Sequence, residues 1–195
     1  MLRRRLLAAS AAVLAAACGS TGSSAVGSPA RTSAPISGGT TTKTPDPSPT
    51  TAHTAGSTAT VELAKGGSFS FTLRADKAPK TVANFVAKAR AGFYDGLTFH
   101  RVVPGFVVQG GDPLGTGSGG GTQPTELSDL PFETGAIGIA RGGDIKVSND
   151  AQFFIVTASA PHLNGQYTNF GQLTQGMDVV LAIKVGDKMK TVTIN

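Results

Sequence analysis

The chain has 195 residues, with 17 Lys and Arg against 12 Asp and Glu, so its formal net charge is +5. Three of the arginines lie within the first five residues, and residues 58–195 hold 12 Lys and Arg against 11 Asp and Glu, a net charge of +1. Nucleic-acid binding needs a strongly basic surface on the folded domain, so we expect no nucleic-acid partner. Because Cys18 is the only cysteine, an internal disulfide is excluded.

The N-terminal residues predict a targeting segment. Arg3 to Arg5 form a basic start, and a largely apolar run follows at residues 6–17. This run is shorter than the roughly 20 residues that span a bilayer as a helix, so we expect a signal peptide at residues 1–17. The sequence Leu-Ala-Ala-Ala-Cys-Gly at 14–19 resembles a bacterial lipobox, although its leucine stands one place early. We therefore expect acyl chains such as palmitate on Cys18. Plain secretion after an Ala-x-Ala site is the alternative.

Residues 18–57 predict a tether between the lipidated cysteine and a folded domain. From Gly19 to Gly56 the chain consists mainly of Ser, Thr, Gly, Pro and Ala, with almost no large apolar residue. Such a segment buries too little surface to offset its chain entropy, so we expect it to be disordered. His53 lies here without neighbouring ligand residues and receives no role.

Residues 58–195 predict a single domain of short strands and two helices. Residues 58–63 and 68–73 alternate apolar and polar side chains around Gly66-Gly67, as in a β-hairpin. Helical spacing of apolar residues predicts a helix at 79–91, with Pro79 in its first turn. A second helix is expected at 176–183. Further strands are expected at 97–103, 106–111, 136–141, 153–157, 168–173 and 190–194. This pattern favours a barrel or a sandwich.

Residues 99–111 (FHRVVPGFVVQGG) combine two apolar strands with one polar residue each. Strand alternation would place Phe99, Arg101 and Val103 on one face, and Val107 and Gln109 on one face after the Pro-Gly turn. Polar groups amid hydrophobic ones are typical of a concave binding site. The alternative is an edge-strand charge at Arg101 and a solvated amide at Gln109.

Other chemistry finds little support in the sequence. There is no cysteine pair and no His/Asp cluster at ligand spacing, so we expect no metal and no cofactor. The glycine-rich residues 115–121 lack the Gly-Lys-Ser/Thr of a phosphate-binding loop, which favours a flexible connection. No nucleophile is marked beside His100 or His162. For His100 we favour a structural histidine that hydrogen-bonds a neighbouring loop.

Several motifs in order resemble those of the cyclophilins, the peptidyl-prolyl cis-trans isomerases, from about Thr58 to Asn195. They are the segment 99–111 and the segments 78–85, 92–101, 109–113, 115–117, 151–155, 163–165 and 170–171. The resemblance implies a mainly β fold, a closed eight-stranded antiparallel barrel capped by two helices. It also implies an isomerase, which must lower a barrier of about 18–20 kcal/mol to peptide-bond rotation by binding the twisted state best.

The resemblance assigns a role to each matching residue. Arg101 would hydrogen-bond the lone pair that twisting creates on the prolyl nitrogen, with Phe106 and Gln109 as catalytic neighbours. Gln109 would hydrogen-bond the rotating carbonyl or hold Arg101. The apolar pocket for the proline ring would consist of Phe106, Val107, Phe154 and Leu163. The remaining substrate-binding positions would be Ala140, Arg141 (Asn in many cyclophilins), Gln152, His162 (Trp in many) and Tyr167 (His in many).

The expected function is therefore isomerisation of X-Pro bonds during the folding of extracytoplasmic proteins. The partners would be proline-containing polypeptides of the cell envelope, and the membrane through the lipid on Cys18. We expect a monomer at the extracytoplasmic face of the bacterial cell membrane. Two alternatives remain open: a lipid-tethered module that binds proline segments without important turnover, and a purely structural envelope lipoprotein.

Overall fold

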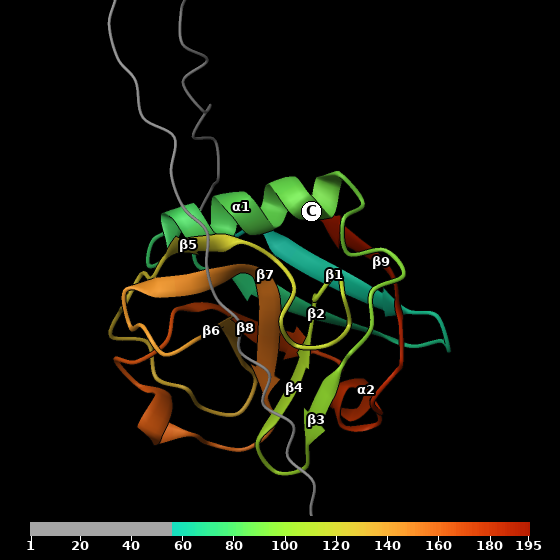
Figure 1. The fold of residues 1–195 in the computed structure, drawn as a ribbon. Coiled ribbons are helices and arrows are strands. Elements are labelled where there is room, and N and C mark those ends of the chain that lie inside the picture. The colour runs from blue at the N-terminus through green and yellow to red at the C-terminus, as the bar shows by residue number, and fades with distance from the viewer. Residues whose placement is uncertain (1–55) are drawn as a thin grey trace, which may run out of the picture. The chain divides into compact units, whose positions relative to one another are not determined.

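The structure is a computed structural model that describes residues 56–195 (Figure 1). The predicted signal peptide, Cys18 and nearly all of the predicted linker lie outside the described residues. The described strands are β1 (Thr58–Leu63), β2 (Ser68–Leu73), β3 (Arg101–Val103), β4 (Val107–Gly110), β5 (Thr122–Pro124), β6 (Ala136–Arg141), β7 (Val147–Val156), β8 (Asn169–Gln175) and β9 (Met189–Ile194). The helices are α1 (Pro79–Arg90), α2 (Met177–Leu181) and the short 3₁₀ helix η1 (Pro161–Leu163).

Eight of the strands form one antiparallel path in the order β3-β4-β7-β6-β8-β2-β1-β9, and β5 pairs with the first part of β7. The two ends of the path meet at an isolated bridge between Thr98 and Lys188. Next to it, the Gly96 N–H donates to the Met189 carbonyl at 2.8 Å. The predicted barrel with two helices is confirmed. Its last seam is a single bridge rather than a full ladder, and the sequence did not predict β5.

Two strand predictions were wrong in extent. The strand expected at 97–103 is regular only from Arg101, because the residues before it bend to make the seam. The alternation therefore breaks at His100, and Phe99 does not share a face with Arg101: Phe99 is buried in the barrel, 6.4 Å from Phe69 between ring centroids, whereas Arg101 is exposed. The strand expected at 153–157 begins at Val147.

Helix α1 begins without a capping side chain of its own. Pro79 occupies the first turn, as predicted, but Ala78 at the N-cap has no side-chain oxygen. The Glu126 carboxylate, 45 residues beyond Thr81, instead accepts hydrogen bonds from the backbone N–H groups of Lys80 at 3.1 Å and Thr81 at 2.7 Å. Free N–H groups at a helix start favour an acidic partner. A distant carboxylate therefore fixes the helix against the barrel.

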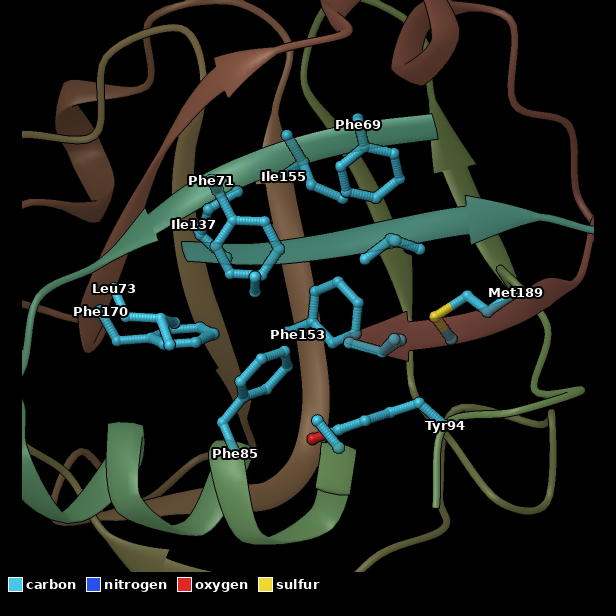
Figure 2. Close-up of a cluster of buried hydrophobic side chains, with 14 of the residues drawn as sticks. Phe69, Phe71, Leu73, Phe85, Tyr94, Ile137, Phe153, Ile155, Phe170 and Met189 are labelled. Carbon is cyan, nitrogen blue, oxygen red and sulfur yellow. The ribbon is translucent and has the colours of Figure 1, made fainter. Parts of the chain in front are cut away.

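Alternation along the strands separates two apolar clusters. Figure 2 shows the cluster inside the barrel, where Phe85 from α1 meets Phe153 from β7 edge to face, with 5.8 Å between ring centroids. The next residue of β7, Phe154, points the other way and belongs to a second cluster. We call this second group the outer cluster: Val107, Phe132, Ala136, Phe154, Val156, Ala160 and Leu163.

Candidate active site

A cavity of about 280 Å³, here called the main pocket, opens above the outer cluster. Its lining residues come from β3, β4, β6, β7 and the segment around η1: Arg101, Phe106, Val107, Gln109, Ala140, Arg141, Phe154, Leu163 and Tyr167. Nine of the eleven residues to which the sequence assigned catalysis or substrate binding therefore line one cavity. The two others, Gln152 and His162, lie beside it.

The floor of the main pocket is apolar and closely packed. Val107, Phe154 and Leu163 are buried there. Phe154 stacks on Phe132 with 5.8 Å between ring centroids and meets Tyr167 edge to face at 5.9 Å. An apolar floor with aromatic walls suits a small ring and offers no nucleophile.

Phe106 forms the outer wall of the main pocket. It follows the Pro-Gly turn between β3 and β4 and is half-buried. The exposed ring of His162 stacks on the Phe106 ring, with 5.4 Å between centroids and 29° between planes, and is not among the residues that line the main pocket. His162 therefore supports the wall without lining the main pocket.

The short hairpin of β3 and β4 places a cation and an amide side by side. Arg101 and Gln109 are cross-strand partners, and the Arg101 Nη1 donates to the Gln109 Oε1 at 3.3 Å. The guanidinium also lies 5.9 Å from the centre of the Phe106 ring. None of the ion pairs among residues 56–195 includes Arg101. Its charge and remaining donors therefore face the main pocket uncompensated by a carboxylate.

The amide of Gln109 is held in turn by Gln152. The Gln109 Nε2 donates to the Gln152 Oε1 at 3.0 Å, and the Gln152 Nε2 donates to the backbone carbonyls of Gly117 at 3.0 Å and Gly119 at 2.8 Å. Gln152 is buried, with 2% of its surface exposed. These bonds form a directed chain from the loop carbonyls to the guanidinium of Arg101.

Arg141 separates the main pocket from a second cavity. Its Nε donates to the Gln166 carbonyl at 2.8 Å, its Nη1 donates to the Gly142 carbonyl at 2.9 Å, and its guanidinium lies 4.5 Å from the centre of the Tyr167 ring. The second cavity, here called the side pocket, measures about 370 Å³ and shares Gln109, Ala140 and Arg141 with the main pocket. Gln152 lines the side pocket.

Sequence reasoning missed most of the side pocket and one buried acid. The side pocket is also lined by Thr122 from β5 and by residues 142–144, which carry no recognisable motif. Asp112 is the only buried carboxylate among residues 56–195. Burial raises the pKa of Asp112, but hydrogen bonds from backbone N–H groups, led by that of Leu114, outweigh burial and hold the pKa below its usual value.

His100 has a structural position, but the hydrogen bond expected for it is absent. Both ring nitrogens are buried and have no hydrogen-bond partner. The ring lies next to Gly117, where an added Cβ would be 3.7 Å from the His100 Cδ2. Burial lowers the pKa of His100, Asp112 opposes this and Arg101 adds to it. The imidazole is therefore neutral near pH 7.

Within residues 56–195, no His, Cys, Asp and Glu side chains gather in a group of three or more that would hold a metal ion. None of the helices in this part of the chain is long and apolar enough to cross a membrane.

Comparisons with known proteins agree with this geometry. The family model described as "Cyclophilin type peptidyl-prolyl cis-trans isomerase/CLD" matches residues 58–195. The chain is 47% identical over 136 residues to peptidyl-prolyl cis-trans isomerase B of Bacillus subtilis, and this match covers 68% of the chain and 94% of the Bacillus protein. It is also 40% identical over 143 residues to a peptidyl-prolyl cis-trans isomerase of Helicobacter pylori, a match that covers 70% of the chain and 86% of the Helicobacter protein.

Solved structures give the same result. A cyclophilin type peptidyl-prolyl cis-trans isomerase of Cryptosporidium parvum, crystallised in the presence of the dipeptide Ala-Pro, superposes with a TM-score of 0.65 at 29% identity and covers 71% of this chain and 98% of that one. A second structure of the same Cryptosporidium protein has a TM-score of 0.66 at 31% identity, and covers 72% of this chain and 98% of that one.

Proposed function

The chain belongs to the cyclophilin-type peptidyl-prolyl cis-trans isomerases, and from this we propose that it isomerises X-Pro bonds in extracytoplasmic proteins while held at the membrane by lipid on Cys18. One observation supports the assignment of the site most directly. An uncompensated guanidinium, Arg101, stands beside a pocket that has an apolar floor and is large enough for a proline ring. The Cryptosporidium relative crystallised with Ala-Pro supports a proline-containing substrate.

The proposed mechanism needs no covalent chemistry. In this proposal the proline ring packs on the floor formed by Phe154 and Leu163, and the Phe106 ring contacts its outer side. As the peptide bond twists, its nitrogen loses resonance with the carbonyl and gains a lone pair. Arg101 donates a hydrogen bond to that lone pair, an interaction that neither planar isomer offers, so the twisted state is bound best. Gln109 holds Arg101 in place or meets the rotating carbonyl.

Substitution of Arg101 tests this role. Arg101→Ala removes the donor and is expected to lower kcat/KM at least about 100-fold, since a positioned electrostatic donor contributes on that scale. Arg101→Lys restores the charge without the planar fork of donors and is expected to recover only part of the rate. The measurement is a protease-coupled isomerisation assay on a short X-Pro peptide, with circular dichroism to verify folding.

Arg90→Ala is the matched control, because Arg90 lies in the last turn of α1, outside the main pocket. A folded Arg101→Ala protein with near-normal turnover would rule out the mechanism. A protein that binds proline peptides but never turns them over, with Arg101 intact, would favour a binding module instead.

The proposed location depends on the N-terminal sequence. Its basic start, its short apolar run and Cys18 support lipidation, with release as a secreted enzyme as the alternative. One acyl chain binds a membrane only marginally, so stable anchoring needs more than one. As a flexible coil, the 38 residues from Gly19 to Gly56 would average about 30–37 Å end to end, which would let the domain reach clients near the membrane.

Mass spectrometry of the mature N-terminus tests this location. The expected result is an acylated Cys18, membrane fractionation of the native chain and loss of that fractionation in Cys18→Ala. An unmodified Cys18, or an N-terminus elsewhere, would show a freely secreted isomerase. We also propose that the enzyme acts as a monomer, for which light scattering of the detergent-solubilised chain should give the mass of one chain.

A further inference from the structure

A buried carboxylate lies at the far end of the hydrogen-bonded chain that reaches Arg101. Asp112 has 1% of its surface exposed and takes part in none of the ion pairs among residues 56–195. Its Oδ1 accepts the Leu114 N–H at 2.9 Å, and its Oδ2 accepts the N–H groups of Thr116 at 2.8 Å and Gly117 at 2.5 Å. Backbone dipoles, rather than a cation, therefore stabilise its charge.

The loop that follows Asp112 is held by hydrogen bonds rather than by packing. Residues 113–118 are all exposed, and even the largest apolar side chain among them, Leu114, is 67% exposed. A segment without buried apolar side chains gains little from packing, so its conformation depends on its hydrogen bonds. Asp112 accepts three of these from its position beside β4, and the Asn149 Nδ2 donates a further one to the Gly119 carbonyl at 3.0 Å. Together these bonds set where the carbonyls of the loop point.

Those carbonyls decide the orientation of Gln152. The Gly117 and Gly119 carbonyls both accept from the Gln152 Nε2, so the flipped amide would place its oxygen against two acceptors. The amide oxygen of Gln152 is then free to accept only from Gln109. This leaves the Gln109 oxygen facing Arg101. Each bond fixes the direction of the next one.

We propose that Asp112 is a positioning residue for the isomerase reaction, which orients Arg101 through the 112–119 loop, Gln152 and Gln109. The inference rests on the proposed role of Arg101. It requires a carboxylate at position 112, because an amide cannot accept at both of its polar atoms. In Asp112→Asn, one of the two oxygens becomes an N–H donor, which would face the N–H groups of either Leu114 or of Thr116 and Gly117.

A double-mutant cycle separates positioning from general support of the fold. Asp112→Asn, Gln152→Leu and the double variant are assayed on the full chain in mild detergent with a short X-Pro peptide. We expect Asp112→Asn to lower kcat/KM about 10-fold, mainly through kcat, and to add less than twofold once Gln152→Leu is present. Effects that act through one chain are not additive, whereas independent effects multiply. Multiplying effects, or a folded Asp112→Asn protein within twofold of the native rate, would overturn the proposal.

A control and a second variant complete the test. Asp187→Asn is the matched control, because Asp187 also accepts a backbone N–H, from Lys184 at 2.7 Å, but lies outside both pockets. It should keep the native rate. If Asp112→Asn does not fold, Gly119→Ala reaches the same contact from the loop, since the added methyl would meet an Asp112 oxygen and must displace it. Its effect should likewise vanish beside Gln152→Leu. A near-normal Arg101→Ala enzyme would instead overturn the role of Arg101 itself.

Discussion

Replacing Gly138 by alanine places a methyl group directly under the floor of the main pocket. On β6, the Cβ of an alanine at this position would overlap the Cζ of Phe154 and lie 2.7 Å from the Cε1 of Phe132. Both contacts are too short for real atoms, so the two rings must shift or the β6 backbone must move away from them. Overpacking of this kind costs about 1–3 kcal/mol of the free energy of unfolding. Because Phe154 is the floor, its displacement also takes up space that the proline ring would occupy. A misfit of about one methylene in an apolar pocket lowers kcat/KM roughly 10-fold or more.

Gly171→Ala is the matched control on the other face of the same sheet. Gly171 lies in the neighbouring strand β8, where it pairs with Ile137 of β6. Its added methyl would lie 2.8 Å from the Thr72 carbonyl oxygen and 3.2 Å from the Phe71 ring, inside the barrel. Urea unfolding should show that both variants are destabilised, but the isomerisation assay should show a loss of kcat/KM only for Gly138→Ala. Equal kcat/KM losses for the two variants would refute the reasoning, because the loss would then follow stability rather than the pocket.

Three further predictions follow from single contacts. Glu126→Ala should lower the free energy of unfolding by about 1–2 kcal/mol, because two N–H groups at the start of α1 lose their acceptor, whereas the exposed Glu133→Ala should change it little in urea unfolding. Because the pKa of His100 is lowered in the folded protein, the unfolded chain binds a proton on this side chain at a higher pH than the folded one does. The free energy of unfolding should therefore fall as the pH drops below about 6.5, and pH-dependent urea unfolding should show a smaller fall in His100→Gln. Arg141→Asn should raise KM roughly 2–5-fold with little change in kcat, since Tyr167 loses its cation–π partner; an unchanged KM would show that this wall stands without Arg141.

The elements predictable from the sequence are those whose local pattern and tertiary surroundings agree. The hairpin of β1 and β2 follows from alternation and from Gly66-Gly67, both of which have positive φ. The helix α1 follows from helical spacing of its buried face. The start of β7 could not be found in this way, because Ser148, Asn149 and Asp150 have the composition of a turn. They are strand residues because β5 pairs with Ser148 and Asn149, and Arg141 of β6 pairs with Ser148. Such pairing overrides a weak local preference for a turn.

The candidate site divides in a similar way. Nine residues quoted from the resemblance line the main pocket. Four of them, Arg101, Val107, Gln109 and Phe154, lie on the adjacent strands β3, β4 and β7, and the others come from β6, the turn before β4 and the segment around η1. The direction of the hydrogen bonds through Gln152 could not be predicted, because it depends on two carbonyls that are 33 and 35 residues away in the chain. The roles of these residues stay predictions until the variants are measured.

The alternation of β7 has a consequence for how the enzyme tolerates change. Phe153 and Ile155 pack inside the barrel, whereas Phe154 and Val156 belong to the outer cluster beneath the main pocket. The same strand thus stabilises the fold with one face and shapes the site with the other. Isomerisation requires only that a twisted amide be bound better than a planar one, so the site needs a floor, a wall and one oriented donor. The floor, the wall and the donor all lie on the face of the sheet that carries the outer cluster. Substitutions there leave the aromatic packing inside the barrel in place. Changes to polar residues of the site, such as Arg101 and Gln109, should therefore alter the rate far more than the free energy of unfolding, whereas changes inside the barrel should do the reverse.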